Sequence, residues 1–467
     1  MPHNSLPAQT VEPQDGAATG SPQTDLPAHA RPVPDAPDPA STAQKTSRSV
    51  NVRPDRELGW TRGDTIRTSI AVTVAAVLLG LAWYLAATDG EGLGGSNAAL
   101  MLLVGAGLGI LFERGRYCFF CVFRDLFEKK DSRGMYAILV SIAVGMIGYA
   151  AIFSTRIPSP TAENTPTDAH IAPVSIALVI AGLAFGLGMV ISGGCIAGHL
   201  YRLPEGHLRS IPALGGVVVG FGFGFLSWDF MYSSFILGAP VPWLPAGNGY
   251  TMAVLVQLGV LVGIGVWLLR WNPPVAGRGD RVVDATEVRR LVFFKRWPAL
   301  VTGTAVGLLA ILAYYKDQPL GVTSQISSLT RTGMTEASWL PHFMPGLDER
   351  LAGCVALVVH TITTNGWLIL GIVLASLAAA LPGRRVRLEK TTAYNSATAL
   401  VGGILLGWGA MIGLGCTIGV LLSGTQAFAL SGWVFSSAIV VAAGLGFRFG
   451  LHRRAAPGVF PPAVSVD

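Results

Sequence analysis

Residues 185–198 read Phe-Gly-Leu-Gly-Met-Val-Ile-Ser-Gly-Gly-Cys-Ile-Ala-Gly, and residues 406–419 read Leu-Gly-Trp-Gly-Ala-Met-Ile-Gly-Leu-Gly-Cys-Thr-Ile-Gly. When the two stretches are aligned without a gap on Cys195 and Cys416, four glycines and one isoleucine also coincide. In both copies an apolar segment of helical length ends in a Gly-Cys-x-x-Gly loop. The chain is therefore expected to contain two copies of one unit, each presenting a thiol at a broken helix.

The composition places the chain in a membrane. Of its 467 residues, 51% are hydrophobic and only 13% are charged, and the mean hydropathy is +0.52. A soluble domain carries about 25% charged residues. The net charge of +6 does not indicate a nucleic-acid partner, because the basic residues lie in short loops between apolar segments. The five cysteines lie in or beside apolar segments, which favours free thiols over a disulfide framework.

Ten apolar segments are predicted to cross the bilayer. They are roughly residues 66–88, 96–112, 134–155, 172–191, 209–227, 250–270, 297–315, 351–381, 396–413 and 427–447. All but four of the 33 Lys and Arg residues lie before the first segment, after the last, or in every second connection. By the positive-inside rule, both termini are then cytoplasmic.

Five crossings per half is an odd number, so the second half is expected to be inserted upside down relative to the first. The predicted fold is an all-α polytopic membrane protein with two inverted-repeat halves and re-entrant or broken helices, an architecture typical of transporters. The predicted divisions are a disordered cytoplasmic tail over 1–58, repeats over 59–245 and 246–450, and a cytoplasmic tail over 451–467. The first tail is rich in Pro, Ala, Ser and Thr and lacks the apolar core of a signal peptide.

The two Gly-Cys loops are the candidate binding elements. A broken helix within a membrane exposes backbone amide groups, which are tolerated where they line a polar path. The predicted backbone donors are those of Gly193, Gly194, Gly198, Gly413, Gly415 and Gly419. A neutral thiol is a weak donor with a polarizable sulfur, which suits a soft, sulfur-containing anion. The alternative is that the glycines only permit close helix packing and the cysteines fill core space.

A second candidate is the pair Cys118-x-x-Cys121, within the arginine-rich segment 113–125. It can form a dithiol redox pair or half of a zinc site, but the sequence holds no second Cys-x-x-Cys or Cys-x-x-His partner, so no metal is predicted. The hydroxyl-rich residues 319–328 are its expected counterpart in the second half. There is no phosphate-binding loop for ATP, and no cofactor is expected.

Several motifs together resemble the YeeE/YedE sulphur-transport family. They are Gly-Arg-Tyr-Cys at 115–118 followed by Arg-Asp at 124–125, Ser-Gly-Gly-Cys-Ile-Ala-Gly-His at 192–199, Gln-Pro-Leu-Gly-Val-Thr-Ser at 318–324, and Gly-Leu-Gly-Cys-Thr-Ile-Gly-Val-Leu-Leu-Ser-Gly at 413–424. The resemblance covers about residues 66–450.

The resemblance implies an inner-membrane transporter, not an enzyme, that imports thiosulfate or a related sulfur anion through a narrow, cysteine-lined centre. It assigns Cys195 and Cys416 to that pathway, with a third thiol from Cys354, which is preferred, or from Cys118 or Cys121. No Cys-Pro-x-Pro carrier domain is fused to the chain, so a cytoplasmic sulfur carrier would be a separate protein. Two alternatives stay open: transport of another solute such as a selenium compound, and a membrane thiol oxidoreductase that uses Cys118 and Cys121.

Overall fold

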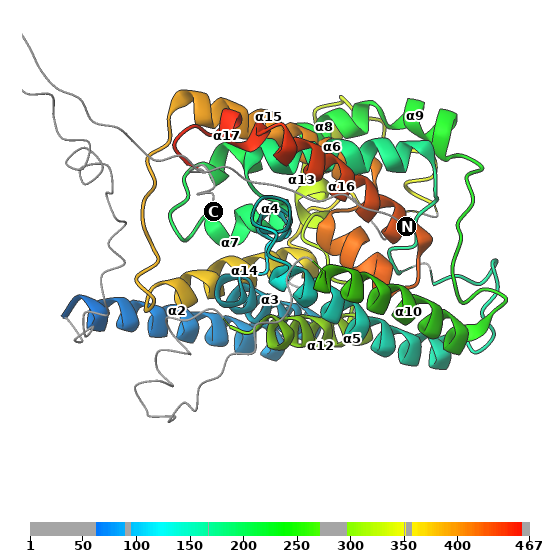
Figure 1. The fold of residues 1–467 in the computed structure, drawn as a ribbon, viewed down its shortest axis with the longest axis horizontal. Coiled ribbons are helices and arrows are strands. Elements are labelled where there is room, and N and C mark those ends of the chain that lie inside the picture. Colours follow the sequence, from blue (N-terminus) through cyan, green and yellow to red (C-terminus); the bar gives the residue numbers. More distant parts are fainter. Residues whose placement is uncertain are drawn as a thin grey trace, which may run out of the picture. The chain divides into compact units, whose positions relative to one another are not determined.

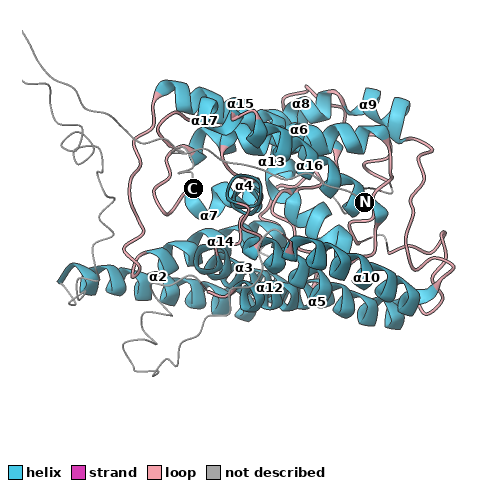
Figure 2. Cartoon of the chain, viewed as in Figure 1, coloured by secondary structure: helices cyan, strands magenta, loops and turns pink. Residues whose placement is uncertain are grey.

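Each predicted crossing coincides with a helix. The computed structural model describes residues 62–88, 95–166, 168–270, 297–349, 351 and 357–459, so the predicted tail over 1–58 and Cys354 lie outside the described residues. The ten long helices are α2 (Arg62–Ala87), α3 (Gly95–Gly115), α5 (Arg133–Arg156), α6 (Ile176–Ser192), α8 (Ser210–Leu226), α10 (Gly249–Leu269), α12 (Ala299–Lys316), α14 (Thr364–Ala380), α15 (Ala393–Ile412) and α16 (Leu430–Arg448). Within the described part of the chain the elements are helices joined by loops, without a strand (Figure 2).

Seven short helices complete the described structure. They are α4 (Phe119–Lys129), α7 (Ile196–Arg202), α9 (Trp228–Met231), the π-helix η1 (Tyr232–Ile236), α13 (Ser324–Glu336), the π-helix η2 (Thr417–Gly424) and α17 (Leu451–Ala455). Eight helical stretches are long and apolar enough to cross a membrane, and α8 with its continuation, bent by 57°, makes a ninth. The prediction of an all-α polytopic membrane protein is confirmed.

The eighth crossing differs from its prediction. The apolar segment is predicted over 351–381, but among its described residues the helix begins only at Thr364. The Thr363 side chain accepts a hydrogen bond from the amide of Gly366 at 3.3 Å, so it caps the helix and fixes its start. Residues 357–363, which include several β-branched side chains, form no helix.

The two halves are interlocked. Helix α8 of the first half packs along α15 of the second, and α16 packs along α6 in the same way. In a second pair of such contacts, α3 of the first half packs on α14 of the second, and α12 of the second half packs on α5 of the first. Helices α6 and α15 also pack against each other, between the two halves. Figure 1 shows α6, α8, α15 and α16 on one side and α2, α3, α5, α10, α12 and α14 on the other, with α4 and α7 between them. Each pairing thus has an equivalent in which the roles of the halves are reversed.

Glycine contacts give the helix directions. A Cβ on Gly216 would meet the backbone of Leu400, and one on Gly220 would meet that of Ile404, so α8 and α15 run parallel. In contrast, Gly188 faces Gly402 while Gly409, further along α15, faces the earlier residue Ala181, so α6 and α15 run antiparallel.

Helices α6 and α15 carry the repeated motif, and they point in opposite directions. The inversion inferred from the odd number of crossings is therefore present in the structure. The exact boundaries at residues 245 and 450 stay a prediction.

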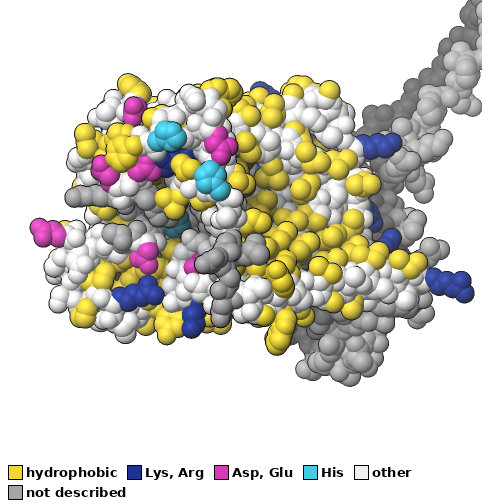
Figure 3. Space-filling model, turned by 180° about the vertical axis from the view of Figure 1, so that it is seen from behind, with side chains coloured by type: hydrophobic (Ala, Val, Ile, Leu, Met, Phe, Trp, Pro, Cys, Tyr) yellow, Lys and Arg dark blue, Asp and Glu magenta, His cyan; other side chains and the backbone are white. Residues whose placement is uncertain are grey.

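The outer face suits lipid. Helices α2 and α10 are the first helices of the two halves. In each, only 22% of the most apolar 18-residue stretch is buried inside the protein. Figure 3 shows hydrophobic side chains over the middle of one face, with charged side chains toward its left and right edges. That distribution is expected for a protein whose apolar belt faces hydrocarbon.

Candidate functional site: a buried thiol cluster between two broken helices

Both Gly-Cys loops are made by the same backbone turn. Helix α6 ends at Ser192, and Gly193 adopts a left-handed φ of 85°. The equivalent residue in the second loop is Leu414, which adopts a φ of 58° despite its side chain. The turn lets a new helix begin directly at the cysteine, because Cys195 caps α7 and Cys416 precedes η2.

Several loop amides are already used within the turns. The N–H groups of Gly193 and Gly413 donate to the carbonyl groups of Met189 and Gly409, and that of Gly415 donates to Ala410. The amide of Gly198 donates to the Sγ atom of Cys195 at 3.3 Å. The predicted backbone donors at these four positions therefore have intramolecular partners, so the side chains become the more important ligand groups.

The first loop carries a cluster of thiols. Cys118 and Cys121 lie at the start of α4, and the thiol of Cys118 contacts those of Cys121 and Cys195. A Cβ placed on Gly198 would lie 3.2 Å from Sγ of Cys118 and 3.4 Å from Sγ of Cys195. Because residue 198 is a glycine, the backbone packs directly against both sulfur atoms.

The second loop meets this cluster. The side chain of Thr417 hydrogen-bonds to the thiol of Cys195, and Cys195 and Cys416 are close enough to interact electrostatically. Both cysteines are 1% exposed. The four described cysteines are free thiols. Residues that are far apart in sequence and come from both halves therefore converge on one buried place.

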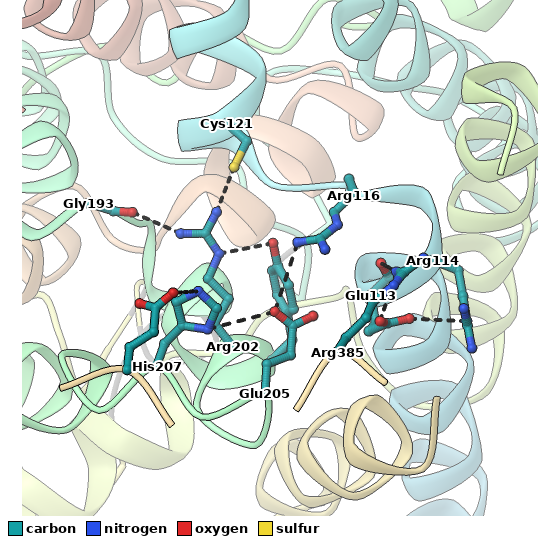
Figure 4. A network of polar contacts seen from close by, with 11 residues as sticks. Glu113, Arg114, Arg116, Cys121, Gly193, Arg202, Glu205, His207 and Arg385 are labelled. Carbon is teal, nitrogen blue, oxygen red and sulfur yellow. Dashed lines mark hydrogen bonds and ion pairs between the residues drawn. The ribbon is translucent and has the colours of Figure 1, made fainter. Parts of the chain in front are cut away.

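An arginine lies at one end of the cluster (Figure 4). The guanidinium of Arg202 donates to Sγ of Cys121 at 2.6 Å and to the carbonyl of Gly193 at 3.0 Å, and its Nε donates to the hydroxyl of Tyr201 at 3.3 Å. It thus places a positive charge directly beside a thiol. An anion that has passed the cysteines would meet this charge next.

Further ionic groups continue from Arg202 toward the α3–α4 and α7–α8 connections. Glu205 lies 3.9 Å from Arg116 and 3.8 Å from His207, which also approaches Glu389 at 3.5 Å. Burial raises the pKa of Glu205, whereas burial and the charge of Arg202 lower the pKa of His207. His207 therefore contributes little positive charge at neutral pH.

Two further histidines, His199 and His360, have different surroundings from His207. His199 is buried, with its ring nitrogens 3.2 Å from Oγ of Ser210 and 3.1 Å from Oγ of Ser192, so it joins α7 to its neighbours. His360 is 70% exposed and lies 3.4 Å from Glu336. His360 is therefore not inside the bundle, which the eighth apolar segment had suggested.

One histidine was missed. His170 lies in the connection between α5 and α6, is 8% exposed, and packs against η2. The sequence shows only an isolated His before an apolar helix, and its contact with residues 419 and 424 arises from the fold. No local pattern could have shown it.

Comparison with known proteins identifies the family. The family model described as sulphur transport matches residues 114–445, which include both Gly-Cys loops and the Cys118-x-x-Cys121 pair. The chain is 27% identical over 354 residues to the thiosulfate transporter TsuA of Escherichia coli, covering 71% of this chain and 89% of the relative. It is 26% identical over 347 residues to TsuA of Spirochaeta thermophila, covering 72% and 93%.

A shorter match joins the chain to another Escherichia coli protein, the probable transporter YedE, with 32% identity over 130 residues, or 28% of this chain and 30% of the relative. The family match extends over most of the membrane helices and both broken-helix loops, as the motifs had indicated. The chain therefore belongs to the sulphur-transport family.

Proposed function

We propose that the protein imports thiosulfate across the bacterial inner membrane, through a passage lined by Cys416, Cys195 and Cys118. The convergence of both Gly-Cys loops on one buried thiol cluster is the observation that supports this most strongly. Two relatives that share about a quarter of their residues with this chain are thiosulfate transporters.

The chemistry of the cluster suits this anion. Thiosulfate has a soft terminal sulfur and three oxygen atoms, and neutral S–H groups can donate to it while their polarizable sulfur atoms contact the soft end. A hydrogen bond to a charged group contributes about 1.5–3 kcal/mol. Removing an ion from water costs several kcal/mol. Several donors in sequence are therefore required, and the chain places three thiols and a guanidinium close together.

We propose Cys118 as a third thiol of the passage, because its thiol contacts Cys195. Cys354, preferred from the sequence, lies outside the described residues and stays a prediction. Cys121 would be the next group, because its sulfur accepts from Arg202. The anion would then leave on the side that carries Arg116, His207 and Arg202, which is the cytoplasmic side if both termini are cytoplasmic. A separate cytoplasmic sulfur carrier is proposed as the acceptor.

The first experiment measures uptake of radiolabelled thiosulfate by purified protein in liposomes. Cys195→Ala, Cys416→Ala and Cys118→Ala should each reduce the initial rate at least tenfold, because each removes one donor from a passage without spare partners. Ser437→Ala is the matched control, since Ser437 is an exposed small side chain on α16. Full uptake by the Cys195 and Cys416 variants would contradict the proposal.

The same liposomes test the substrate. Unlabelled thiosulfate should compete with the labelled anion, while sulfate, sulfite and selenite should compete much more weakly, because they lack a terminal soft sulfur. Stronger competition by selenite than by thiosulfate would instead favour a selenium compound. If Cys118 and Cys121 cycled through a disulfide while Cys195 was dispensable, the thiol oxidoreductase interpretation would replace transport.

A further inference from the structure

His170 packs against Gly419 of the second Gly-Cys loop much as Cys118 packs against Gly198 of the first. Aligning the repeats on their cysteines makes Gly419 the equivalent of Gly198. A Cβ on Gly198 would lie 3.2 Å from Sγ of Cys118, and a Cβ on Gly419 would lie 3.2 Å from Cε1 and 3.3 Å from Nε2 of His170. The inverted repeat therefore has an imidazole on one side of the cysteines and a thiol on the other.

The surroundings of His170 are polar but uncharged. Its ring lies beside Gly321, which precedes α13, and its backbone carbonyl lies beside Gly424 of η2. A Cβ on Gly321 would be 3.7 Å from Nε2 of His170 and 3.6 Å from Nδ2 of Asn365, so two polar side chains flank this glycine. Four parts of the chain thus meet here: the α5–α6 connection, η2, the segment before α13, and the start of α14.

Two polar atoms at this place have no partner among the described residues. Nδ1 of His170 and Oδ1 of Asn365 are both buried, and neither makes a hydrogen bond. An unpaired buried polar atom costs about 1–3 kcal/mol. Such a cost is expected where a passing ligand or water supplies the missing partner. Gly419 and Gly321 let the backbone pack directly against the ring, because neither carries a side chain.

We propose that His170 and Asn365 form an outer oxyanion subsite, which holds the oxygen end of thiosulfate before its soft sulfur reaches Cys416. The inference rests on the proposed thiosulfate import. The donors to the hard oxygen atoms of thiosulfate are the protonated ring nitrogen of His170 and Nδ2 of Asn365, which lies 3.6 Å from a Cβ placed on Gly321. Oδ1 of Asn365 is an acceptor and takes a hydrogen bond from water instead, while the thiols suit the sulfur of the anion. The anion would therefore enter with its terminal sulfur directed toward the cysteines.

The protonation state of the ring fits this role. Burial lowers the pKa of His170 to about 4. At neutral pH the imidazole is neutral, with one nitrogen donating and the other accepting. A neutral donor binds the anion without holding it as tightly as a permanent charge would.

The experiment compares thiosulfate uptake kinetics of His170→Gln, His170→Ala and Asn365→Ala with those of the unaltered protein in liposomes. His170→Ala should raise the KM for thiosulfate about tenfold or more, while the maximal rate changes little, because the thiols and Arg202 are intact. His170→Gln should restore part of the affinity, because its amide keeps an N–H donor. His360→Ala is the matched control, since His360 is 70% exposed and lies 3.4 Å from the surface residue Glu336.

The outcomes separate this inference from the proposed function. If the unaltered protein takes up no thiosulfate, the proposed function fails. If the unaltered protein transports and His170→Ala has an unchanged KM, only the outer subsite is overturned. If both His170 variants instead show a lower maximal rate and a lower melting temperature, the ring has a packing role. That result would also overturn the outer subsite.

Discussion

Cys195 and Cys416 are equivalent in the repeat, but their sulfur atoms have different partners. Sγ of Cys195 accepts the amide of Gly198, whereas the side chain of Cys416 caps nothing. The two loops thus hold their cysteines differently, and Gly198, which lies beside the sulfur atoms of both Cys118 and Cys195, is the position to test.

Gly198→Ala should reduce thiosulfate uptake severalfold with little change in melting temperature. The added methyl group would lie 3.2 Å from Sγ of Cys118 and 3.4 Å from Sγ of Cys195, so it fills the space between two thiols without meeting backbone. Gly215→Ala is the control, because a Cβ there has no neighbour within 4 Å. Initial rates of labelled thiosulfate uptake check this, and equal rates for the two variants would contradict a passage beside Gly198.

Acid should destabilise the protein partly through His170. The pKa of this residue is lowered from 6.5 to about 4 in the folded protein, so the unfolded chain binds more protons between those values. The folded state therefore loses stability as the pH falls from about 6.5 toward 4. Melting temperatures measured across this range should fall less steeply for His170→Gln, which cannot take up a proton. Parallel curves would show that the ring is not buried as described.

The sequence identified the cysteines but not the histidine, for a physical reason. Cys195 and Cys416 stand in a repeated motif, and a repeat is visible without a structure. The role of His170 depends on its contact with Gly419, between residues that no periodic pattern connects. The choice of Cys118 over Cys121 as the neighbour of Cys195 likewise depends on how α4 packs.

At the scale of helices, glycine sets how closely the two halves approach. A Cβ on Gly403 would collide with the carbonyl oxygen of Ala213, and one on Gly407 would collide with that of Val217, so α8 and α15 are in backbone contact. Close approach of this kind is the main source of helix association in a bilayer, where burial of apolar surface provides little driving force.

Gly403→Ala should lower the melting temperature in detergent by several degrees. The methyl group would force α8 and α15 apart, and overpacking of this kind costs about 1–3 kcal/mol. Gly259→Ala on α10 is the control, because a Cβ there meets nothing within 4 Å, and it should have no effect. Equal melting temperatures for the two variants would show that the contact between α8 and α15 is looser than described.

Helix positions followed from hydropathy because each crossing is a long apolar run. The start of the eighth helix did not, since it depends on the Thr363 cap and on contacts of this segment, such as the 2.7 Å bond from the Thr363 amide to Oε1 of Gln325 on α13. Hydropathy also does not predict which helices pack together: nothing in the sequence of α8 indicates that it packs on α15.

At the scale of the whole molecule, the inverted arrangement predicts which loops share a side of the membrane. Cysteines introduced as Lys129→Cys and Ala337→Cys, both at exposed positions, should react from opposite sides. In intact cells a membrane-impermeant maleimide should label Ala337→Cys, while Lys129→Cys should react only after the membrane is made permeable, because the positive-inside rule predicts that the Lys- and Arg-rich connections are cytoplasmic. Labelling of both variants in intact cells would contradict this orientation. The unaltered chain is the background control.

Because α8 is paired with α15 and α16 with α6, neither half can turn as a rigid body against the other without separating helices that touch backbone to backbone. An elevator or rocker-switch cycle is thus disfavoured in this scaffold. We expect substrate to advance instead through small side-chain and loop rearrangements in a stationary frame, so that crosslinks tying α8 to α15 should leave turnover intact.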